Sequence, residues 1–238
     1  MIDSLTDIFA SLTIIDLSPT IENGMPRWPG DPDVHIERSS TYEKDGYFCQ
    51  TVTMGEHTGS HVDAPAHMIA AMADKSIDTY PPEMIIGPAV VYHLSSLGLK
   101  PGERVSLAQI IAIEESMEYV PGAGDIALFD FGWMKYWSTG EYFATNAPGL
   151  DEEVTQLFAE RGVRAVGSDT ASCDMPVKDG KPFYAYGHEK HWLPNEIFII
   201  EMLANLELIE NRCFFIALPL KIKGGSGSPI RPIALIPR

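Results

Sequence analysis

Short apolar runs bounded by turn residues recur along the chain, and this pattern predicts an α/β fold. Runs of about four to eight residues rich in branched and aromatic side chains are typical of β-strands. They occupy residues 14–17, 47–54, 88–94, 125–129, 164–167, 197–201 and 213–218. Because strands outnumber the predicted helices, and both helices lie between strands, we expect a domain built around a mixed β-sheet.

The two predicted helices are recognised by their boundary residues. Ser106 is followed three positions later by Gln109, which is the capping-box pattern of a helix start. Asp151 is expected to cap a second helix, and Gly162 is expected to end it.

Length and charge narrow the class of protein. The chain has 238 residues, 45% of them hydrophobic, so we expect residues 1–238 to form one domain. Asp and Glu number 33 against 17 Lys and Arg, for a formal net charge of −16. Nucleic acid and anionic membranes repel such a chain, and no apolar run reaches the ~18 residues of a membrane span. The expected partner is therefore a small molecule, with neither nucleic acid nor membrane.

The cysteines predict a reducing environment. Cys49, Cys173 and Cys213 are odd in number and widely spaced, which supports neither a disulfide framework nor a structural zinc site. The first residues carry acid where a secretory signal would carry base. Both observations favour a cytoplasmic protein.

The segment with the strongest chemical signal holds three histidines and an aspartate. His57, His61, Asp63 and His67 lie at even offsets from one another. On a helix Asp63 would point about 240° away from His57, and a glycine and a proline also oppose a helix. In an extended segment, even offsets place all four side chains on one face. We therefore predict a bent, extended segment in which His57, His61 and Asp63 converge on a divalent metal.

His67 has two possible roles in such a site. Imidazole and carboxylate ligands suit Zn²⁺, Mn²⁺ or Fe²⁺, and three protein ligands leave a position open for water. His67 is either a fourth ligand or the group that moves a proton next to the metal. We favour the proton-transfer role.

At this point the sequence resembles a known family, the metal-dependent cyclases, which include kynurenine formamidase and isatin hydrolase. The run from His57 to His67, HTGSHVDAPAH, is similar to the HxGTHxDxPxH signature of that family, with Ser60 in place of the signature threonine. Further matches to family segments lie at residues 15–18, 28–31, 148–150, 166–172, 199–206, 219–222 and 228–231.

The resemblance implies a fold, an activity and a set of site residues. The family fold is a swivelling β/α/β-type domain around a mixed sheet, and its members hydrolyse amide or cyclic amide bonds. The resemblance makes His57, His61 and Asp63 ligands of a first metal, with His67 as the catalytic histidine. Glu201 matches a ligand of a second metal. We expect Zn or Mn, one or two ions per chain, and a homodimer or homotetramer.

The histidine of the second metal site is left open by the sequence. The family places it twelve residues before the glutamate, and that position here is Glu189. We favour His188, with a one-residue loop difference, over Glu189 and His191. Trp28 and Phe48 are the candidates for walls around an aromatic substrate.

Three functions compete at this stage. The first is a hydrolase that cleaves an N-formyl or cyclic amide bond of a small substrate. The second is a metal-assisted cyclase, lactonase or dehydratase with the same ligands. The third is a metal-binding relative without turnover, which the presence of His67 opposes, because a structural site needs no proton-transfer group.

Overall fold

A nine-stranded mixed sheet organises the chain, as predicted for an α/β fold. The computed structural model describes residues 2–238, without the side chains of Ile2, Asp3 and Leu5. In spatial order the strands are β1 (Leu12–Asp16), β15 (Ile233–Pro237), β13 (Arg212–Ile216), β5 (Ile86–His93), β7 (Ile126–Asp130), β9 (Ala165–Ser168), β12 (Phe198–Glu201), β4 (His61–Asp63) and β14 (Gly227–Pro229). The four central strands β5, β7, β9 and β12 are parallel, and the pairs on either side are antiparallel.

Shorter elements surround this sheet. The helices are α1 (Ile2–Ala10), α2 (Tyr42–Asp45), α3 (Leu107–Glu114), α4 (Glu141–Thr145) and α5 (Glu152–Glu160). Three two-stranded ladders pair β2 (His35–Ser40) with β3 (Cys49–Thr53), β6 (Arg104–Val105) with β8 (Gly149–Leu150), and β10 (Val177–Lys178) with β11 (Lys181–Pro182). All seven predicted strands are present, with ends shifted by a few residues.

Both predicted helices have the expected caps. The Ser106 hydroxyl accepts a hydrogen bond from the Gln109 backbone, and the Gln109 side chain accepts one from the Ser106 backbone. Asp151 accepts a bond from the Glu152 backbone N–H at 2.9 Å and opens α5. These contacts satisfy N–H groups that have no partner within the first helical turn.

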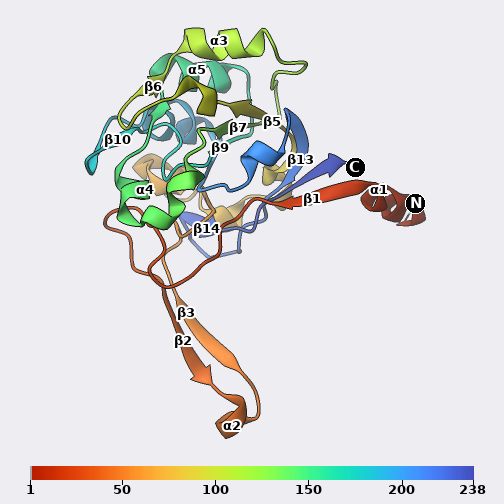
Figure 1. Ribbon diagram of the computed structural model, residues 1–238, viewed down its shortest axis with the longest axis vertical. Helices are drawn as coiled ribbons and strands as arrows, with labels where there is room; N and C mark the ends of the chain where they lie inside the picture. Colours follow the sequence, from red (N-terminus) through yellow and green to blue (C-terminus); the bar gives the residue numbers. More distant parts are fainter. Residues whose placement is uncertain (1) are drawn as a thin grey trace.

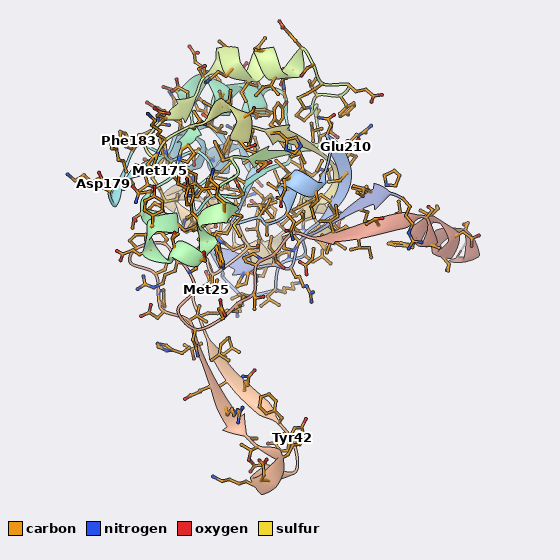
Figure 2. All side chains as sticks on the ribbon, viewed as in Figure 1. Met25, Tyr42, Met175, Asp179, Phe183 and Glu210 are labelled. Atoms are coloured by element: carbon orange, nitrogen blue, oxygen red, sulfur yellow. The ribbon has the colours of Figure 1, made fainter. Side chains whose placement is uncertain are left out.

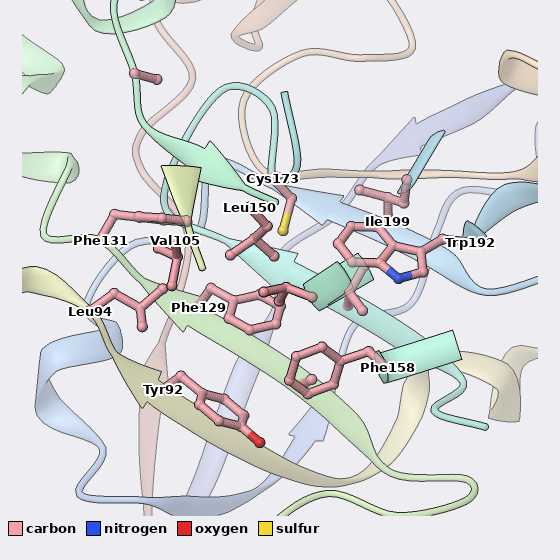
Figure 3. Packing of buried hydrophobic residues seen from close by; sticks show 14 of the residues in the cluster. Tyr92, Leu94, Val105, Phe129, Phe131, Leu150, Phe158, Cys173, Trp192 and Ile199 are labelled. Atoms are coloured by element: carbon pink, nitrogen blue, oxygen red, sulfur yellow. The ribbon is translucent and has the colours of Figure 1, made fainter. Parts of the chain in front are cut away.

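The central strands are buried on both faces, which explains their unbroken apolar runs. In β7, Ala127 and Phe129 point to one side of the sheet, whereas Ile126 and Leu128 point to the other. The first side is covered by α3 and α5 and filled largely by aromatic rings (Figures 1 and 3). Phe129 and Phe158 pack edge to face there, with ring centroids 5.0 Å apart.

Two segments extend away from this body. The β2–β3 hairpin, with α2 at its tip, projects from one end of the molecule, and α1 projects from another side (Figure 1). All five residues of β3 are exposed, and Tyr42 at the tip of the hairpin is 70% exposed (Figure 2). The hairpin therefore buries little apolar surface within its own chain. Among residues 2–238, no helix combines the length and apolarity that crossing a membrane requires.

Candidate metal centre

Strand pairing brings three predicted residues together at one end of the sheet. The antiparallel pair β12–β4 sets Glu201 opposite His61 and Ile199 opposite Asp63. Residues two apart on a strand share a face, so His61, Asp63 and Glu201 point to the same side. His61 Nε2 lies 3.4 Å from Glu201 Oε2 and 3.5 Å from Asp63 Oδ1. All three side chains are buried.

His57 reaches the same point from the turn that precedes β4. Gly59 adopts a positive φ of 60° and bends the chain, as its place between the histidines predicts. His57 Nδ1 lies 2.6 Å from Asp63 Oδ1, and Nε2 lies 2.9 Å from the Ser226 hydroxyl. That hydroxyl donates to Glu56 at 2.8 Å. A side chain on Gly227 would place its Cβ 2.6 Å from His57 Cε1, so this glycine makes room for the ring.

His188, of the three candidates for the later ligand, is the residue that enters the site. It lies in the π-helical turn Gly187–His191, and its Nε2 is 3.4 Å from Asp63 Oδ2 and 3.5 Å from Glu201 Oε1. Its Nδ1 is 2.6 Å from Asp174, a carboxylate that also accepts two backbone N–H bonds. Glu189 is exposed, and His191 points to Glu152.

The turn that carries His188 explains the shifted spacing. The Trp192 N–H donates to the Gly187 carbonyl at 2.7 Å, five residues back rather than four. A π-helical turn holds one residue more than an α-helical turn. His188 lies thirteen positions before Glu201, one more than the twelve that the resemblance implied, and the turn that carries it holds one residue more than an α-helical turn.

His67 borders the cluster without a hydrogen bond to it. It lies at the end of the turn Pro65–His67, with its ring centroid 4.0 Å from that of His57 and 6.2 Å from that of His188. Donor atoms of His57, Asp63 and His67 lie within 4.8 Å of one another. This distance is compatible with either predicted role of His67. Burial, and the histidines around it, lower the pKa of His67 to about 4.

The neighbouring charges shift the other pKa values in opposite directions. Burial opposes the charged form of His61, but Asp63 and Glu201 raise the pKa of His61 to about 9. Burial likewise opposes charge on Asp63, yet the surrounding histidines hold the pKa of Asp63 well below its usual range. Burial raises the pKa of Glu201. The cluster therefore contains buried charges of opposite sign, whose mutual attraction offsets the cost of removing each of them from water.

A cavity of about 260 Å³ opens onto these side chains. Its lining combines the histidines and carboxylates with apolar side chains, and the residues are Trp28, Asp31, His57, His61, Asp63, His67, Met68, Ala171, Ser172, Met175, Ala185, His188, Glu201 and Met202. The lining has no lysine or arginine, although three carboxylates face the cavity. The imidazole and carboxylate donors fit a divalent metal, which would balance that negative charge.

The two predicted substrate-binding residues have different positions. Trp28 lines the cavity, from the Pro-rich loop before β2. Phe48 does not: it lies on the projecting hairpin, is 44% exposed, and stacks on Tyr42 with centroids 6.2 Å apart. Within one chain, Phe48 is therefore not a wall of this cavity. Phe48 was predicted to line the cavity only because it is aromatic. Its residue type gives no information about the direction in which its strand runs.

Several residues of the site lie outside the set of site residues predicted from the sequence, although Asp31 and Ser172 fall in the family-like segments 28–31 and 166–172. Asp174 and Ser226 each bond a histidine of the cluster, and Asp31 and Ser172 line the cavity. Asp174 and Ser172 do follow the predicted strand 164–167, at the strand end where sites often form. Ser226 and Glu56 carry no comparable signal, since their contact joins positions 170 residues apart.

Comparison with known proteins places the chain in a family. The Cyclase family model, described as "Putative cyclase", matches residues 15–175, and the chain belongs to this family. It is 29% identical over 220 residues to isatin hydrolase of Roseibium aggregatum, covering 87% of this chain and 82% of that protein. It is 28% identical over 226 residues to kynurenine formamidase of Bacillus cytotoxicus, covering 92% of this chain and 95% of that one.

The fold agrees with a solved relative. Isatin hydrolase A from Ralstonia solanacearum superposes with a TM-score of 0.88 at 29% identity, over 99% of this chain and 97% of that chain. These matches confirm the family resemblance and the mixed α/β fold inferred from the sequence.

Proposed function

We propose that this chain is a metal-dependent hydrolase that cleaves an amide bond, N-formyl or cyclic, in a small substrate. The single observation that carries the proposal is the position of Asp63. This buried carboxylate lies within 3.5 Å of a ring nitrogen of each of His57, His61 and His188. The kinship with isatin hydrolase and kynurenine formamidase, which both act on amide bonds, supports the reaction class.

Five residues are assigned as metal ligands: His57, His61, Asp63, His188 and Glu201. Their donor atoms are nitrogen and carboxylate oxygen, the set that zinc and manganese accept. When bound, such an ion supplies Lewis acidity, which activates water and polarises a carbonyl group. We propose Zn or Mn, in one or two copies, with Asp63 shared between the copies if there are two.

Contacts outside the cluster decide which ring nitrogen each histidine presents. His57 Nε2 is held by Ser226, His188 Nδ1 by Asp174, and His61 Nδ1 by the Gly59 carbonyl at 2.8 Å. The other nitrogen of each ring therefore faces Asp63. Such outer contacts fix the tautomer and the orientation of ligand histidines.

His67 is assigned to proton transfer. Its ring lines the cavity beside His57, yet it has no hydrogen bond to the carboxylates. An imidazole that makes no hydrogen bond to the carboxylates can accept a proton from the reacting water and return it to the leaving nitrogen. The same uncommitted ring explains why the chain keeps a histidine where a purely structural metal site needs none.

The cavity favours a neutral substrate with an aromatic or otherwise flat apolar part. Trp28, Met68, Met175 and Met202 supply apolar surface, and the lining has no lysine or arginine to bind an anionic group. Polarisable methionine and tryptophan side chains pack well against aromatic rings.

The test is a metal measurement followed by a substrate panel. Protein purified without a metal-affinity tag is expected to carry one to two equivalents of Zn or Mn by elemental mass spectrometry. The metal-loaded protein is then assayed on isatin, on formanilide (the N-formyl amide of aniline) and on a γ-lactone. Hydrolysis of an amide with loss of activity on chelation supports the proposal. Turnover of the lactone alone makes the protein a lactonase, and metal-free protein after dialysis against Zn²⁺ or Mn²⁺ contradicts metal dependence.

We also propose that the chain forms a homodimer or homotetramer through the hairpin. Tyr42, Tyr47, Phe48 and Val52 are each at least 44% exposed on a segment that has no covering layer in its own chain. Burial of such apolar surface against a second copy removes it from water. The cytoplasmic location stays a prediction, supported by the three free cysteines.

A further inference from the structure

Ser172 is a buried polar residue of the cavity that the proposed mechanism does not use. It is 3% exposed, and within residues 2–238 its hydroxyl has no hydrogen-bond partner. The residue lines the cavity together with the metal-centre side chains. Buried hydroxyls are nearly always hydrogen-bonded, because leaving one unpaired costs the energy of removing it from water. A group without a protein partner at the wall of a cavity is therefore a candidate for contact with a ligand.

The backbone around Ser172 is tied to the metal centre on its C-terminal side. The Cys173 N–H donates to Glu201 Oε1 at 3.3 Å, and Asp174 holds His188 at 2.6 Å. The Ser172 carbonyl accepts a bond from the Thr170 hydroxyl at 2.8 Å. The main chain at Ser172 is thus held close to Glu201 and His188, while its hydroxyl makes no hydrogen bond to the described residues.

The chemistry of the lining indicates which substrate atom the hydroxyl meets. Outside the proposed ligand set, Asp31 is a carboxylate acceptor that lines the cavity. Donors without a partner are few, because the lining has no lysine or arginine and the Nε2 atoms of His61 and His188 already face carboxylates. His67 is assigned to proton transfer, so Ser172 is the hydroxyl donor left for an amide carbonyl. A serine O–H is a donor that needs no charge.

We propose that the Ser172 hydroxyl donates a hydrogen bond to the carbonyl oxygen of the amide substrate. This inference rests on the proposed amide hydrolysis and adds a substrate-binding residue to it. The bond strengthens as negative charge develops on that oxygen during attack by water, so Ser172 contributes more to the transition state than to the bound substrate. Ser172 is not one of the five residues assigned as metal ligands, so its loss leaves that set complete.

The proposal predicts a loss of turnover without a loss of metal. Ser172→Ala is expected to lower kcat/KM on the amide substrate about 10- to 100-fold, the range between a neutral hydrogen bond and an oxyanion-stabilising donor. Metal content per chain should stay at the wild-type value. Ser172→Cys, which keeps nearly the same volume but has a weak donor, should lose a similar factor. Ser172→Thr, which keeps the hydroxyl, should recover part of the loss.

The matched control is Ser76→Ala. Ser76 is also buried, at 5% exposure, but its hydroxyl donates to Asp78 at 2.7 Å and it does not line the cavity. Ser76→Ala should leave kcat/KM unchanged. A change of less than about twofold in both Ser172→Ala and Ser172→Cys overturns the proposal, and so does loss of metal from either variant.

A binding experiment separates this inference from the proposed function. Oxindole is an unactivated lactam that retains the amide carbonyl and resists hydrolysis. Titration calorimetry on metal-loaded protein is expected to show a Kd about 5- to 10-fold weaker for Ser172→Ala than for the wild type, as for one neutral hydrogen bond. If no substrate of the panel is turned over but this difference is found, the hydrolase proposal fails and the Ser172 assignment stands. Equal Kd values, or no binding of oxindole to the wild type, refute the Ser172 assignment.

Discussion

Glu201 and His61 face each other across the antiparallel pair β12–β4, with Oε2 of the glutamate 3.4 Å from Nε2 of the histidine. The contact joins residues 140 positions apart through the register of two short strands. It also places three of the five proposed ligands, His61, Asp63 and Glu201, on paired strands of the sheet. Because strands move less than loops, ligands on paired strands are held in a fixed geometry.

His61 and His67 are expected to respond differently to replacement by alanine. His61→Ala removes a ligand from the centre of the cluster, so metal content and activity should fall together. His67→Ala should retain the metal and lose about 10²- to 10⁴-fold in kcat, the usual contribution of a proton-transfer group. Elemental analysis and kinetics on the same preparations measure both. Loss of metal from His67→Ala would make that residue a ligand instead.

Asp174 is expected to control metal affinity from outside the ligand set. Its carboxylate holds His188 Nδ1 at 2.6 Å, and loss of such a contact typically weakens metal binding about 10- to 100-fold. Asp174→Asn should show a Kd raised by this factor in titrations of metal-free protein with Zn²⁺. Asp151→Asn is the control, since asparagine caps helix α5 equally well. Equal metal affinity of Asp174→Asn and the wild type would contradict this role.

Gly227 is expected to tolerate no side chain. An added Cβ would lie 2.6 Å from His57 Cε1 and 2.6 Å from the Val62 carbonyl, so either the ring or strand β14 must move. Gly227→Ala should lower the free energy of unfolding by about 1–3 kcal/mol, as overpacking does, and weaken metal binding through His57. Gly122→Ala serves as control, because the nearest atom to its Cβ is 4.0 Å away. Urea denaturation of both variants gives the comparison.

The His93–Asp130 pair should make stability depend on pH. The hydrogen bond between His93 Nδ1 and the Asp130 carboxylate, at 2.8 Å, raises the pKa of His93 above its ordinary value. The pair therefore stabilises the fold fully at a pH below the pKa of histidine in the unfolded chain, about 6.5. This stabilisation is lost as the pH rises through the higher pKa of His93 in the folded protein. His93→Asn should therefore cost more stability at pH 6 than at pH 9. Denaturation at the two pH values measures this, with exposed His35→Asn as control. A cost that does not change with pH would rule out the charged pair.

The hairpin should decide the oligomeric state. Phe48→Glu places a charge in the exposed apolar surface of the β2–β3 hairpin, and light scattering coupled to gel filtration should show dissociation toward the monomer. Ile111→Glu changes an equally exposed apolar residue, 42% accessible, on helix α3. It should leave the assembly intact. An unchanged mass for Phe48→Glu would remove the hairpin from the interface.

The parts of the site that the sequence predicted are those encoded by local spacing. His57, His61, Asp63 and His67 fall within eleven residues, and the even spacing of His61 and Asp63 anticipates the face that they share on strand β4. His57 and His67 lie on the turns before and after that strand. The resemblance supplied Glu201 and a nearby histidine. His188 was favoured over Glu189 on the assumption of a one-residue loop difference, but the π-helical turn that carries it was not predicted, because such a turn leaves no distinctive composition in the sequence.

The contacts that orient the histidines were not predictable, since they depend on how distant segments meet. Ser226 approaches His57 only because β14 pairs with β4, and nothing in the residues around Ser226 specifies that pairing. Phe48 shows a second limit of the sequence. The strand next to it was predicted, but the direction of the hairpin, away from the body of the molecule, depends on the tertiary structure (Figure 1).

The order of strands in the sheet has a consequence for protein synthesis. Strand β4 lies between β12 and β14, which both follow it by more than a hundred residues. At about 5–20 residues per second, roughly 8–34 s separate the emergence of His57 from that of Ser226, 169 positions later. For most of this interval the growing chain has His57, His61, Asp63 and His67 without Glu201, and for all of it His57 lacks its contact with Ser226. The candidate metal centre therefore takes its final shape only when the C-terminal strands β12 and β14 pair with β4.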